Sequence, residues 1–457
     1  MEESETIWAA DEFGQASLRD PRRTRRLVQL GAALAAQPAG RITQVFDGSA
    51  EREAAYRLIG NAGFTWRDIA AGMHLAAARR AAAFPQVVVP IDGVSFTMAA
   101  KSDEFGPICM KVHGPGAHAM TALALTPDGV PLGVLGHEWW TRSRTSAPAY
   151  TTDTRPVTQR ETGYWLKVLD QAMEALRREA PQTRPWFQLD RGGDCADVLR
   201  HAIDLGADIT VRACYDRCVT DGKLWAKAAR GQFVGTYPLT IRRPGKRPRV
   251  ATISVHIRRV ELQLRLGPNS KGALIPTTMQ VVEARERHAQ KGVLWRLLTT
   301  RPVESLADAQ AVITAYTRRW RIEEFHLAWK SGACGIEQSW MRRREHFFKW
   351  ATIASAVAAR LERIKLLSRQ SPDLPALGEF SRDEIDATIA LRKPKGVAFG
   401  AEPTLGEVTR WIADLGGYTG KSSGGPAGIR VLTRGFDRVL SAAIAVATIR
   451  KDPAWRG

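Results

Sequence analysis

The sequence predicts an α/β protein whose core carries a basic, β-rich insertion and is flanked by a helical segment at each end. Apolar runs that end in aspartate, Val87–Asp92 and Trp186–Asp190, are typical of buried strands in an α/β sheet. Residues 213–300 alternate apolar and polar side chains, as in ATISVHIRRVELQLRL, which indicates further strands. Helical spacing and capping residues dominate 1–70 and 371–457, so helices are expected on both sides of the core.

The length and the charge of the chain limit which domain organisation and which partners are expected. The 457 residues allow about three domains, and we expect a helical domain over 1–70, the core over 71–370 and a second helical domain over 371–457. The chain holds 66 Lys and Arg against 47 Asp and Glu, which gives a formal net charge of +19. Such an excess favours a polyanionic partner, most often nucleic acid, although charge alone leaves a ribosomal or membrane-surface role open.

Several classes of protein are disfavoured. No apolar run reaches the ~18 residues that a membrane span needs, and the acidic start MEESETIWAADEF lacks an apolar signal region. None of the five cysteines forms a Cys-x-x-Cys pair, so structural zinc is not expected. The sequence therefore predicts a reduced, cytoplasmic protein.

The first domain is expected to hold short helices with a basic stripe. Asp20 can cap a helix that has Pro21 at its first position, and a second helix is expected from Ser49. A solvated basic face is the alternative to a DNA-reading helix, because acids and bases in this segment roughly balance. The arginines that would contact DNA cluster on the first helix: Arg22, Arg23 and Arg26, with Arg25 beside them.

From about residue 86 the pattern changes to strands and helices. The strand Val87–Asp92 precedes two more strands with the turn Pro127–Gly129 between them, and Trp186–Asp190 opens a strand–helix–strand unit. Carboxylates at strand ends matter because α/β sheets gather their sites there. The remaining expected elements are strands at 119–125, 132–137 and 208–212, and helices at 161–178 and 196–205.

The stretch 213–300 holds 17 Lys and Arg against 5 Asp and Glu, which is most of the excess positive charge of the chain. A β-ribbon with this charge would suit contacts with the phosphate backbone of DNA, and the alternative is a flexible basic loop. Five basic residues crowd one expected hairpin: Arg242, Arg243, Lys246, Arg247 and Arg249.

A helix is expected from Ser305 through the segment AYTRRWRIEEFHLAWKSG, residues 315–332, which carries the densest chemistry. Four of its residues fall within roughly 60° of one another at about 100° per residue: Tyr316, Arg319, Glu323 and Lys330. An aromatic, two cations and a carboxylate on one face suit a metal ion beside a phosphate, whereas Glu324 points elsewhere. The alternative is a surface helix with salt-bridging charges.

Two strand-end aspartates and a helical glutamate, Asp92, Asp190 and Glu323, form the usual set for two divalent ions in phosphodiester chemistry. Such ions lie about 3.5–4 Å apart, and they activate the attacking oxygen and stabilise the leaving oxygen. One aspartate among many acids would mean little. The triple, with a basic insertion before the glutamate, is far more specific.

With these residues in place, the chain resembles the bacterial DDE transposases of the Tn-five type, within the insertion-sequence-four superfamily. The likeness covers nearly the whole chain. LRDPRRTRRLVQLGAALA and AYRLIGN resemble the N-terminal DNA-binding domain, and PIDGVSF, GVLGHEWW and FQLDRGGD resemble the catalytic core. RLLTTRPVESLADAQAVITAYTRRWRIEEFHLAWKSGA resembles the YREK signature region, and WIADLGGYTG resembles the C-terminal region.

The resemblance implies a ribonuclease-H-like catalytic core with a β-rich insertion, an N-terminal DNA-binding domain and a C-terminal helical dimerisation domain. It implies cut-and-paste transposition in bacteria, close to the nucleoid. A homodimer would bind terminal inverted repeats of double-stranded DNA, nick them, form and resolve hairpins, and insert the element into target DNA with two Mg²⁺ or Mn²⁺ ions. Two rivals remain: an inactive regulator that binds the same ends, and a ribonuclease-H-like nuclease without strand transfer.

Carried over by position, the resemblance makes Asp92, Asp190 and Glu323 the catalytic metal ligands. The residues that would engage DNA near the cleavage site are Tyr316, Arg319, Lys330 and Arg212, together with Trp295, which would stack a base flipped out of the hairpin. An ordinary core aromatic is the alternative for Trp295. The chain departs from the family pattern at Gly93, Val94, Gly192 and Leu327, which leaves local DNA contacts open.

Overall fold

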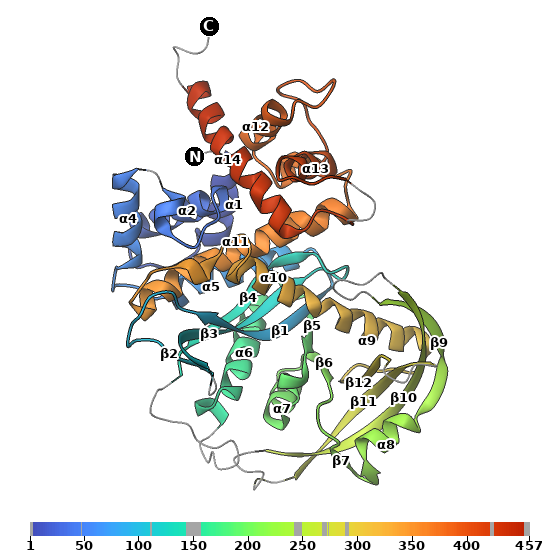
Figure 1. Ribbon diagram of the computed structural model, residues 1–457. Helices are drawn as coiled ribbons and strands as arrows, with labels where there is room; N and C mark the ends of the chain where they lie inside the picture. The colour runs from blue at the N-terminus through green and yellow to red at the C-terminus, as the bar shows by residue number, and fades with distance from the viewer. Residues whose placement is uncertain are drawn as a thin grey trace.

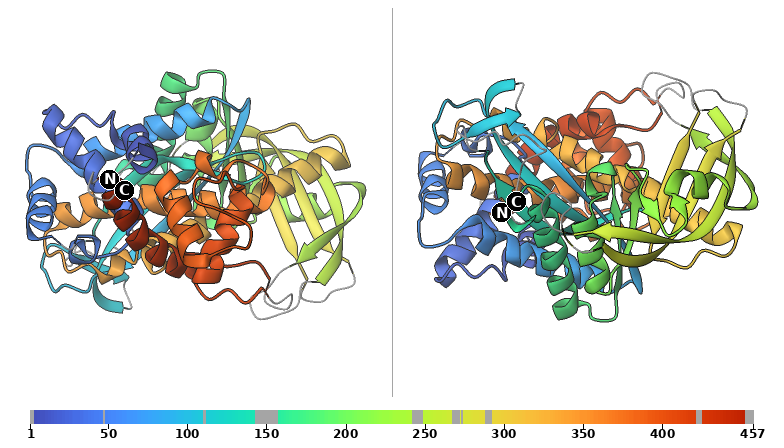
Figure 2. Two further views of the ribbon diagram at one scale, coloured as in Figure 1. Left: turned by 90° about the horizontal axis from the view of Figure 1, so that it is seen from above. Right: turned by 90° about the horizontal axis from the view of Figure 1, so that it is seen from below.

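The computed structural model describes residues 3–46, 48–109, 112–142, 157–241, 249–266, 272, 274–287, 292–420 and 425–451. One large sheet runs through the molecule with helices on both faces, and the N-terminal and C-terminal helices gather on one side (Figure 1). The insertion lies at the opposite end of the molecule from the N-terminal helices (Figure 2). The mixed α/β architecture expected from the sequence is confirmed.

In the described part of the chain, five helices precede the sheet. As expected, Asp20 caps the second helix by accepting a hydrogen bond from the Arg22 amide at 2.9 Å, and Pro21 takes its first position. Thr65 and Asp68 form a capping box at the start of the fifth. The helices are α1 (Glu3–Phe13), α2 (Pro21–Ala36), α3 (Ile42–Val45), α4 (Ser49–Ile59) and α5 (Trp66–Ala81).

The first half of the sheet is a mixed α/β arrangement. Strand β1 pairs antiparallel with β3 and parallel with β5, and β5 pairs parallel with β6. Strands β2 and β4 both pair antiparallel with β3. The strands are β1 (Gln86–Thr97), β2 (Gly106–Cys109), β3 (Val112–Leu125), β4 (Pro131–Trp140), β5 (Arg184–Leu189) and β6 (Asp208–Arg212).

The insertion extends this sheet through antiparallel strands. Strand β12 pairs with β6, and β11, β10 and β9 follow in turn, so the insertion and the core share one sheet. The β-rich expectation is confirmed, although one short helix, α8, was missed in it. The elements are β7 (Cys218–Val219), β8 (Gly222–Lys223), α8 (Leu224–Ala229), β9 (Gln232–Ile241), β10 (Arg249–Arg265), β11 (Leu274–Glu286) and β12 (Leu294–Thr299).

The sheet separates two apolar cores. Along β1, Val87, Val89 and Ile91 face one core, whereas Val88 and Phe96 face the other, as the two-residue period of a strand requires. The first core lies against α6 (Thr162–Glu179) and α7 (Ala196–Asp204).

The second core contains the remaining long helices. Helix α11 is buried along most of its length, between the sheet and the terminal helices (Figure 1). None of the helices in the described part of the chain is long and apolar enough to cross a membrane. Helices α1, α2, α3, α4 and α5 contribute to this core. The further helices on this side are α9 (Leu306–Arg318), α10 (Trp320–Lys330), α11 (Arg344–Gln370), α12 (Arg382–Arg392), α13 (Leu405–Leu415) and α14 (Ile429–Lys451).

Candidate active site

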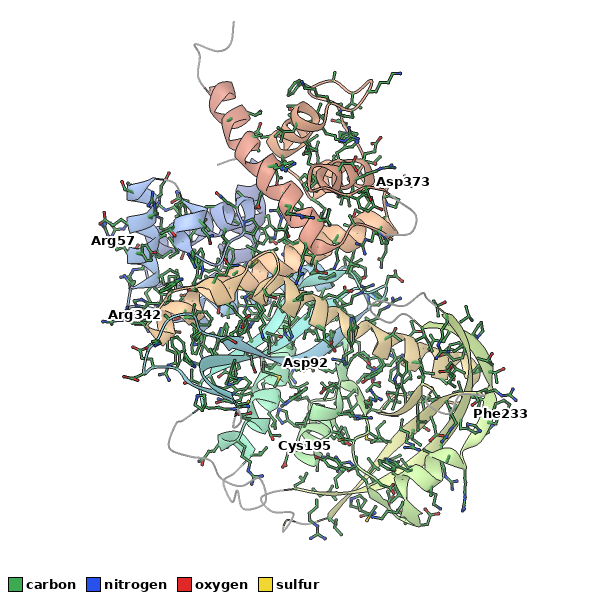
Figure 3. The ribbon with its side chains drawn as sticks, viewed as in Figure 1. Arg57, Asp92, Cys195, Phe233, Arg342 and Asp373 are labelled. Carbon is green, nitrogen blue, oxygen red and sulfur yellow. The ribbon has the colours of Figure 1, made fainter. Side chains whose placement is uncertain are left out.

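Strand register brings two of the three carboxylates together. Ile91 of β1 pairs with Leu189 of β5 in a parallel ladder, so Asp92 and Asp190 occupy the next position on neighbouring strands. The prediction that Asp92 ends its strand is wrong. Strand β1 continues to Thr97 because β3 keeps pairing with it after β5 has ended. Asp92 therefore lies in the middle of the sheet (Figure 3), where its parallel neighbour stops.

The backbone beyond each aspartate holds its side chain. The amide of Gly93 donates to Oδ1 of Asp92 at 2.8 Å, and the amide of Gly192 donates to Oδ1 of Asp190 at 2.7 Å. Both glycines are positions at which the chain departs from the family pattern. Each aspartate keeps its other oxygen, Oδ2, outside these backbone contacts.

The third carboxylate comes from a helix that is not continuous. The expected single helix through residues 315–332 divides at Arg319 into α9 and α10. The reason is a tight turn, in which the Arg319 amide bonds the Tyr316 carbonyl and the Ile322 amide bonds the Arg319 carbonyl, each at 3.1 Å. Both bonds span three residues instead of four. Arg319 thus lies at the joint between the two helices.

The side chain of Arg319 links two of the carboxylates. Its Nη1 lies 3.1 Å from Oδ2 of Asp92, and its Nη2 pairs with Oε1 of Glu323 one turn along α10. Arg319 is only 11% exposed and Asp92 20%, so water screens the first pair weakly. One guanidinium therefore serves two acids and draws Glu323 towards the sheet.

The electrostatics of Asp92 show that the three acids are near one another. Burial and, next, the charge of Asp190 raise the pKa of Asp92 to about 6, and Glu323 acts in the same direction. Arg319 and the Gly93 amide oppose the shift without cancelling it. A carboxylate whose pKa is raised by other carboxylates is typical of a functional site.

Aromatic and basic residues border these acids. Tyr316 is buried, which raises its pKa. The charges of Arg319, Arg212 and Asp190 also act on this pKa, so these residues lie near the phenol. Trp295 is partly buried and meets Tyr316 edge-on, with ring centroids 5.7 Å apart. Arg212 ends β6 directly opposite Leu297 of β12. The structure thus gathers these three with the acidic residues and Arg319.

Lys330 lies apart from this group. Its Nζ is 3.5 Å from Oε1 of Glu337, and the same oxygen accepts the amide of Thr97 at 2.6 Å. Lys330 therefore sits by the far end of β1. Glu324 pairs with Arg321 at 2.9 Å and with Lys365 of α11 at 3.5 Å, which places it on a different side of α10 from Glu323.

The arginines of α2 are distant from the carboxylates and differ from one another. Helix α11 lies between α2 and the sheet (Figure 1). The side chain of Arg22 is 83% exposed. Arg26 is partly exposed and donates to Gln29 at 2.9 Å, whereas Arg23 donates to the Leu18 carbonyl at 3.2 Å. Arg23 therefore helps hold the domain together, whereas Arg22 and Arg26 pair with the nearby side chains of Asp20 and Gln29.

Most of the basic hairpin lies outside the described residues, namely Arg242, Arg243, Lys246 and Arg247. The flanking strands β9 and β10 pair antiparallel, with Ile241 opposite Arg249. Arg249 itself pairs with Glu286 of β11. Its charge is therefore partly neutralised within the protein.

The donor set suits a hard divalent cation, because Asp92, Asp190 and Glu323 offer carboxylate oxygens and repel one another. Burial, and after it the repulsion from Asp190 and Glu323, raise the pKa of Asp92, and a bound cation would relieve that repulsion. In the described part of the chain, however, no group of three or more His, Cys, Asp or Glu is arranged to hold a metal. Arg319 pairs with two of the acids, so it would have to release them when a metal binds.

Sequence reasoning missed two polar groups close to the site. Thr121 contacts both Asp92 and His326, and no sequence pattern marks this pair. Buried Asp194 accepts bonds from the amide of Cys214 at 2.6 Å and from Nε of Arg217 at 3.0 Å. Asp194 thereby ties the loop after Asp190 to the start of the insertion.

A basic surface between α10 and α11 was also missed, although its run of arginines is visible in the sequence. Arg342, Arg343 and Arg344 are exposed, and neighbouring Trp340 is 63% exposed. Arg41 of the N-terminal segment lies over the Trp340 ring at 5.7 Å. An aromatic residue among cations is a common feature of nucleic-acid surfaces.

Two models of known families match parts of the chain. Residues 5–63 match the family model described as transposase DNA-binding, and residues 166–360 match that described as transposase DDE domain. The α2 arginines lie in the first match, and Asp190 and Glu323 lie in the second. The matches support a DNA transposase, with the ribonuclease-H-like core and the divalent metal that a DDE domain implies.

Proposed function

We propose that this protein is a cut-and-paste DNA transposase of the Tn-five type. It binds the terminal inverted repeats of its element, nicks them, makes the break through a DNA hairpin and inserts the element into target DNA. The observation that supports it most is the placement of Asp92 and Asp190 side by side, with Glu323 joined to Asp92 through Arg319.

In this proposal Asp92, Asp190 and Glu323 hold two Mg²⁺ or Mn²⁺ ions. The ions supply activation of the attacking oxygen and stabilisation of the leaving oxygen. Asp92 is suited to this role because burial and the neighbouring acids destabilise its carboxylate, and a bound cation would offset that destabilisation. The Gly93 and Gly192 amides each fix one carboxylate oxygen, which leaves the other to face the ions.

The neighbouring side chains would position the DNA strand. Once released from the acids, Arg319 can donate two parallel hydrogen bonds to a phosphate, and Arg212 adds a second guanidinium. Tyr316 lies near Arg212 and Arg319 and contacts Trp295, so it would help to align them. Lys330 would reach a phosphate farther along the strand, since it sits by Glu337 and the end of β1.

The wider surfaces suit recognition of DNA ends. Arg22 and Arg26 of α2 would contact the terminal repeat, and the basic insertion would follow the phosphate backbone. Two copies of the protein would dimerise through residues 371–457 and so hold two DNA ends together. This segment exposes several apolar side chains that a partner could cover: Leu374, Leu377, Leu391 and Phe399.

Trp295→Ala tests the hairpin route against simple hydrolysis by a nuclease. Closing a hairpin forces one base out of the stack, and stacking on an aromatic ring returns about 1–3 kcal/mol. We expect the variant to nick end DNA in Mg²⁺ normally but to make hairpins about 5- to 150-fold more slowly. Denaturing gels should show nicked strand accumulating while double-strand breaks become scarce.

A thermal melt must accompany that assay, because Trp295 packs against Tyr316. Hairpins formed at the parental rate by a folded variant would mean that Trp295 is a core aromatic and would favour a plain nuclease. If the unaltered protein binds ends without cutting them, it is an end-binding regulator instead.

A further inference from the structure

The strand of Asp92 and the helix of Glu323 are joined by a buried hydrogen-bonded link. Thr121 of β3 is the register partner of Asp92 on β1, so the two side chains share one face of the sheet. The Thr121 hydroxyl lies 3.4 Å from the main-chain carbonyl oxygen of Asp92 and 2.8 Å from Nε2 of His326. His326 belongs to α10 and follows Glu323 by three residues, which puts both on neighbouring turns.

One proton arrangement satisfies both contacts. The carbonyl oxygen of Asp92 can only accept, so the single hydroxyl proton of Thr121 points to it. Nε2 of His326 must then donate to the Thr121 oxygen, which requires a proton on Nε2. Burial, helped by Arg319 and Lys330, lowers the pKa of His326 to about 3 and keeps the ring neutral.

Burial and ring packing restrict the side chains of Thr121 and His326. Thr121 is fully buried and His326 is 7% exposed. The His326 ring packs beside Phe325 and Trp329, with centroids 5.4 and 6.4 Å away. Neither side chain can therefore change rotamer without disturbing the core, so the bonds fix a distance between β1 and α10.

We propose that Thr121 and His326 act as a strut that sets the separation between Asp92 and Glu323, which makes His326 a positioning residue for the metal site. The inference rests on the proposed function, because it assumes that these two carboxylates bind metal together. Metal ligands must stand within a few tenths of an ångström of their ideal distances. Groups that orient ligands from behind typically change metal affinity or activity about 10- to 100-fold when removed.

The sheet offers a matched control. On the same two strands, Ser95 and His118 are register partners joined by a hydrogen bond of 2.9 Å between Oγ and Nδ1. His118 is buried and Ser95 is partly buried, and both residues belong to the sheet. Breaking it removes a similar hydroxyl–imidazole bond without releasing α10.

The test compares variants that break the strut with variants that keep it. His326→Leu and Thr121→Val remove the link, whereas His326→Gln keeps a donor near the Nε2 position and Thr121→Ser keeps the hydroxyl. Two readouts are taken: the Mn²⁺ concentration that half-saturates the rise in melting temperature, and the Mn²⁺ dependence of end-DNA cleavage. We expect both concentrations to rise about 10- to 100-fold in the first two variants and to stay near the parental value in the other two.

Ser95→Ala should leave both titrations unmoved while lowering the melting temperature. The proposal is contradicted if Thr121→Val and His326→Leu bind Mn²⁺ like the parent. It is also contradicted if His326→Gln and Thr121→Ser lose as much Mn²⁺ affinity as Thr121→Val and His326→Leu do. If His326→Leu does not fold, the near-isosteric Thr121→Val decides. A parent that shows neither Mn²⁺-dependent melting nor cleavage would remove the proposed function, and the strut with it.

Discussion

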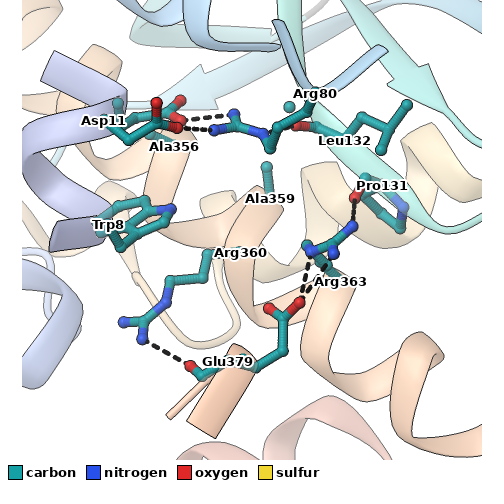
Figure 4. A pocket seen from close by; sticks show the side chains of 13 residues that line it. Trp8, Asp11, Arg80, Pro131, Leu132, Ala356, Ala359, Arg360, Arg363 and Glu379 are labelled. Atoms are coloured by element: carbon teal, nitrogen blue, oxygen red, sulfur yellow. Dashed lines mark hydrogen bonds and ion pairs between the residues drawn. The ribbon is translucent and has the colours of Figure 1, made fainter. Parts of the chain in front are cut away.

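Two clusters of arginines and carboxylates in this molecule use the same chemistry to different ends. One surrounds Asp92 in the middle of the sheet. The other lies where α1, α5 and α11 meet, around a cavity of about 160 Å³ (Figure 4). The difference between them is the number of paired arginines relative to the number of acids in each cluster.

The junction cluster is matched within the chain. Arg80 lies 2.8 Å from Asp11 and 2.6 Å from Glu12 of α1, and its Nε donates to the Leu132 carbonyl. Arg363 of α11 lies 2.8 Å from Glu379 (Figure 4). Arg79 adds a second cation to Asp11, and Arg360 donates to the Glu379 carbonyl. Asp11, Glu12 and Glu379 therefore have cationic partners within the protein and need no bound cation to balance their charge.

The cluster at Asp92 is unmatched. Burial, followed by the charges of Asp190 and Glu323, raises the pKa of Asp92, and Arg319 pairs with both Asp92 and Glu323. Such a surplus of negative charge costs stability and is typical of a site that binds a cation or performs chemistry. Charge balance therefore separates a structural ion-pair cluster from a functional one.

The largest expected effect sharpens this contrast. Asp92→Ala, Asp190→Ala and Glu323→Ala should each reduce cleavage of end DNA by on the order of 10⁴-fold, because each removes a metal ligand. Binding to the ends should survive, since cations supply that affinity. Gel-shift and cleavage assays on the same preparations measure both.

Melting in EDTA completes that test. Because each substitution relieves repulsion among the acids, the three variants should melt at or above the parental temperature. Glu324→Ala, which removes an acid paired with Arg321 and Lys365, should cut DNA almost normally. Near-parental cleavage by any of the three would remove that residue from the metal site.

Arg80→Ala should give the opposite pattern at the junction. It leaves Glu12, only 2% exposed, without its partner, and breaking a buried pair costs about 3–5 kcal/mol. We expect a clear loss of stability in urea and an unchanged cleavage rate per folded molecule. Arg22→Ala, which breaks an exposed pair with Asp20, is the matched control and should change stability by less than about 1 kcal/mol. Loss of cleavage in fully folded Arg80→Ala would contradict the conclusion that the junction cluster is only structural.

Local sequence signals predicted much of the fold. The Asp20–Pro21 start of α2, the Ser305 start of α9 and the strand at Asp208–Arg212 all occur as expected. These features depend on neighbours along the chain, through capping and the alternation of side chains. The carboxylates could be named as candidates because their types and order are visible in the sequence.

What the sequence could not supply depends on contacts between distant segments. That β1 continues past Asp92 follows from pairing with β3, which no pattern within 87–92 records. The division of the helix at Arg319 occurs where that side chain reaches an acid 227 residues away. Thr121 and His326, 205 residues apart, likewise become partners only in the folded chain.

The smallest expected effect is the dependence of stability on pH at Asp92. The folded protein raises the pKa of this group to about 6, against an ordinary value near 3.9 in the unfolded chain. An acid with a raised folded pKa carries no penalty below about pH 4, and the penalty grows until the pH exceeds about 6. Asp92→Asn removes this titration. The stability of Asp92→Asn relative to the parent, measured in urea with EDTA, should therefore rise from pH 4.5 to pH 6.5 and then level off, with a ceiling of about 3 kcal/mol.

Mg²⁺ should narrow the difference in stability between Asp92→Asn and the parent above pH 6, because it stabilises the parent. Glu324→Gln, scanned alongside, reports the effect of removing an acid that already has cationic partners. A difference that is flat across this range would mean that the acids around Asp92 are no more strained than those at the junction, and the contrast between the two clusters would then rest on activity alone.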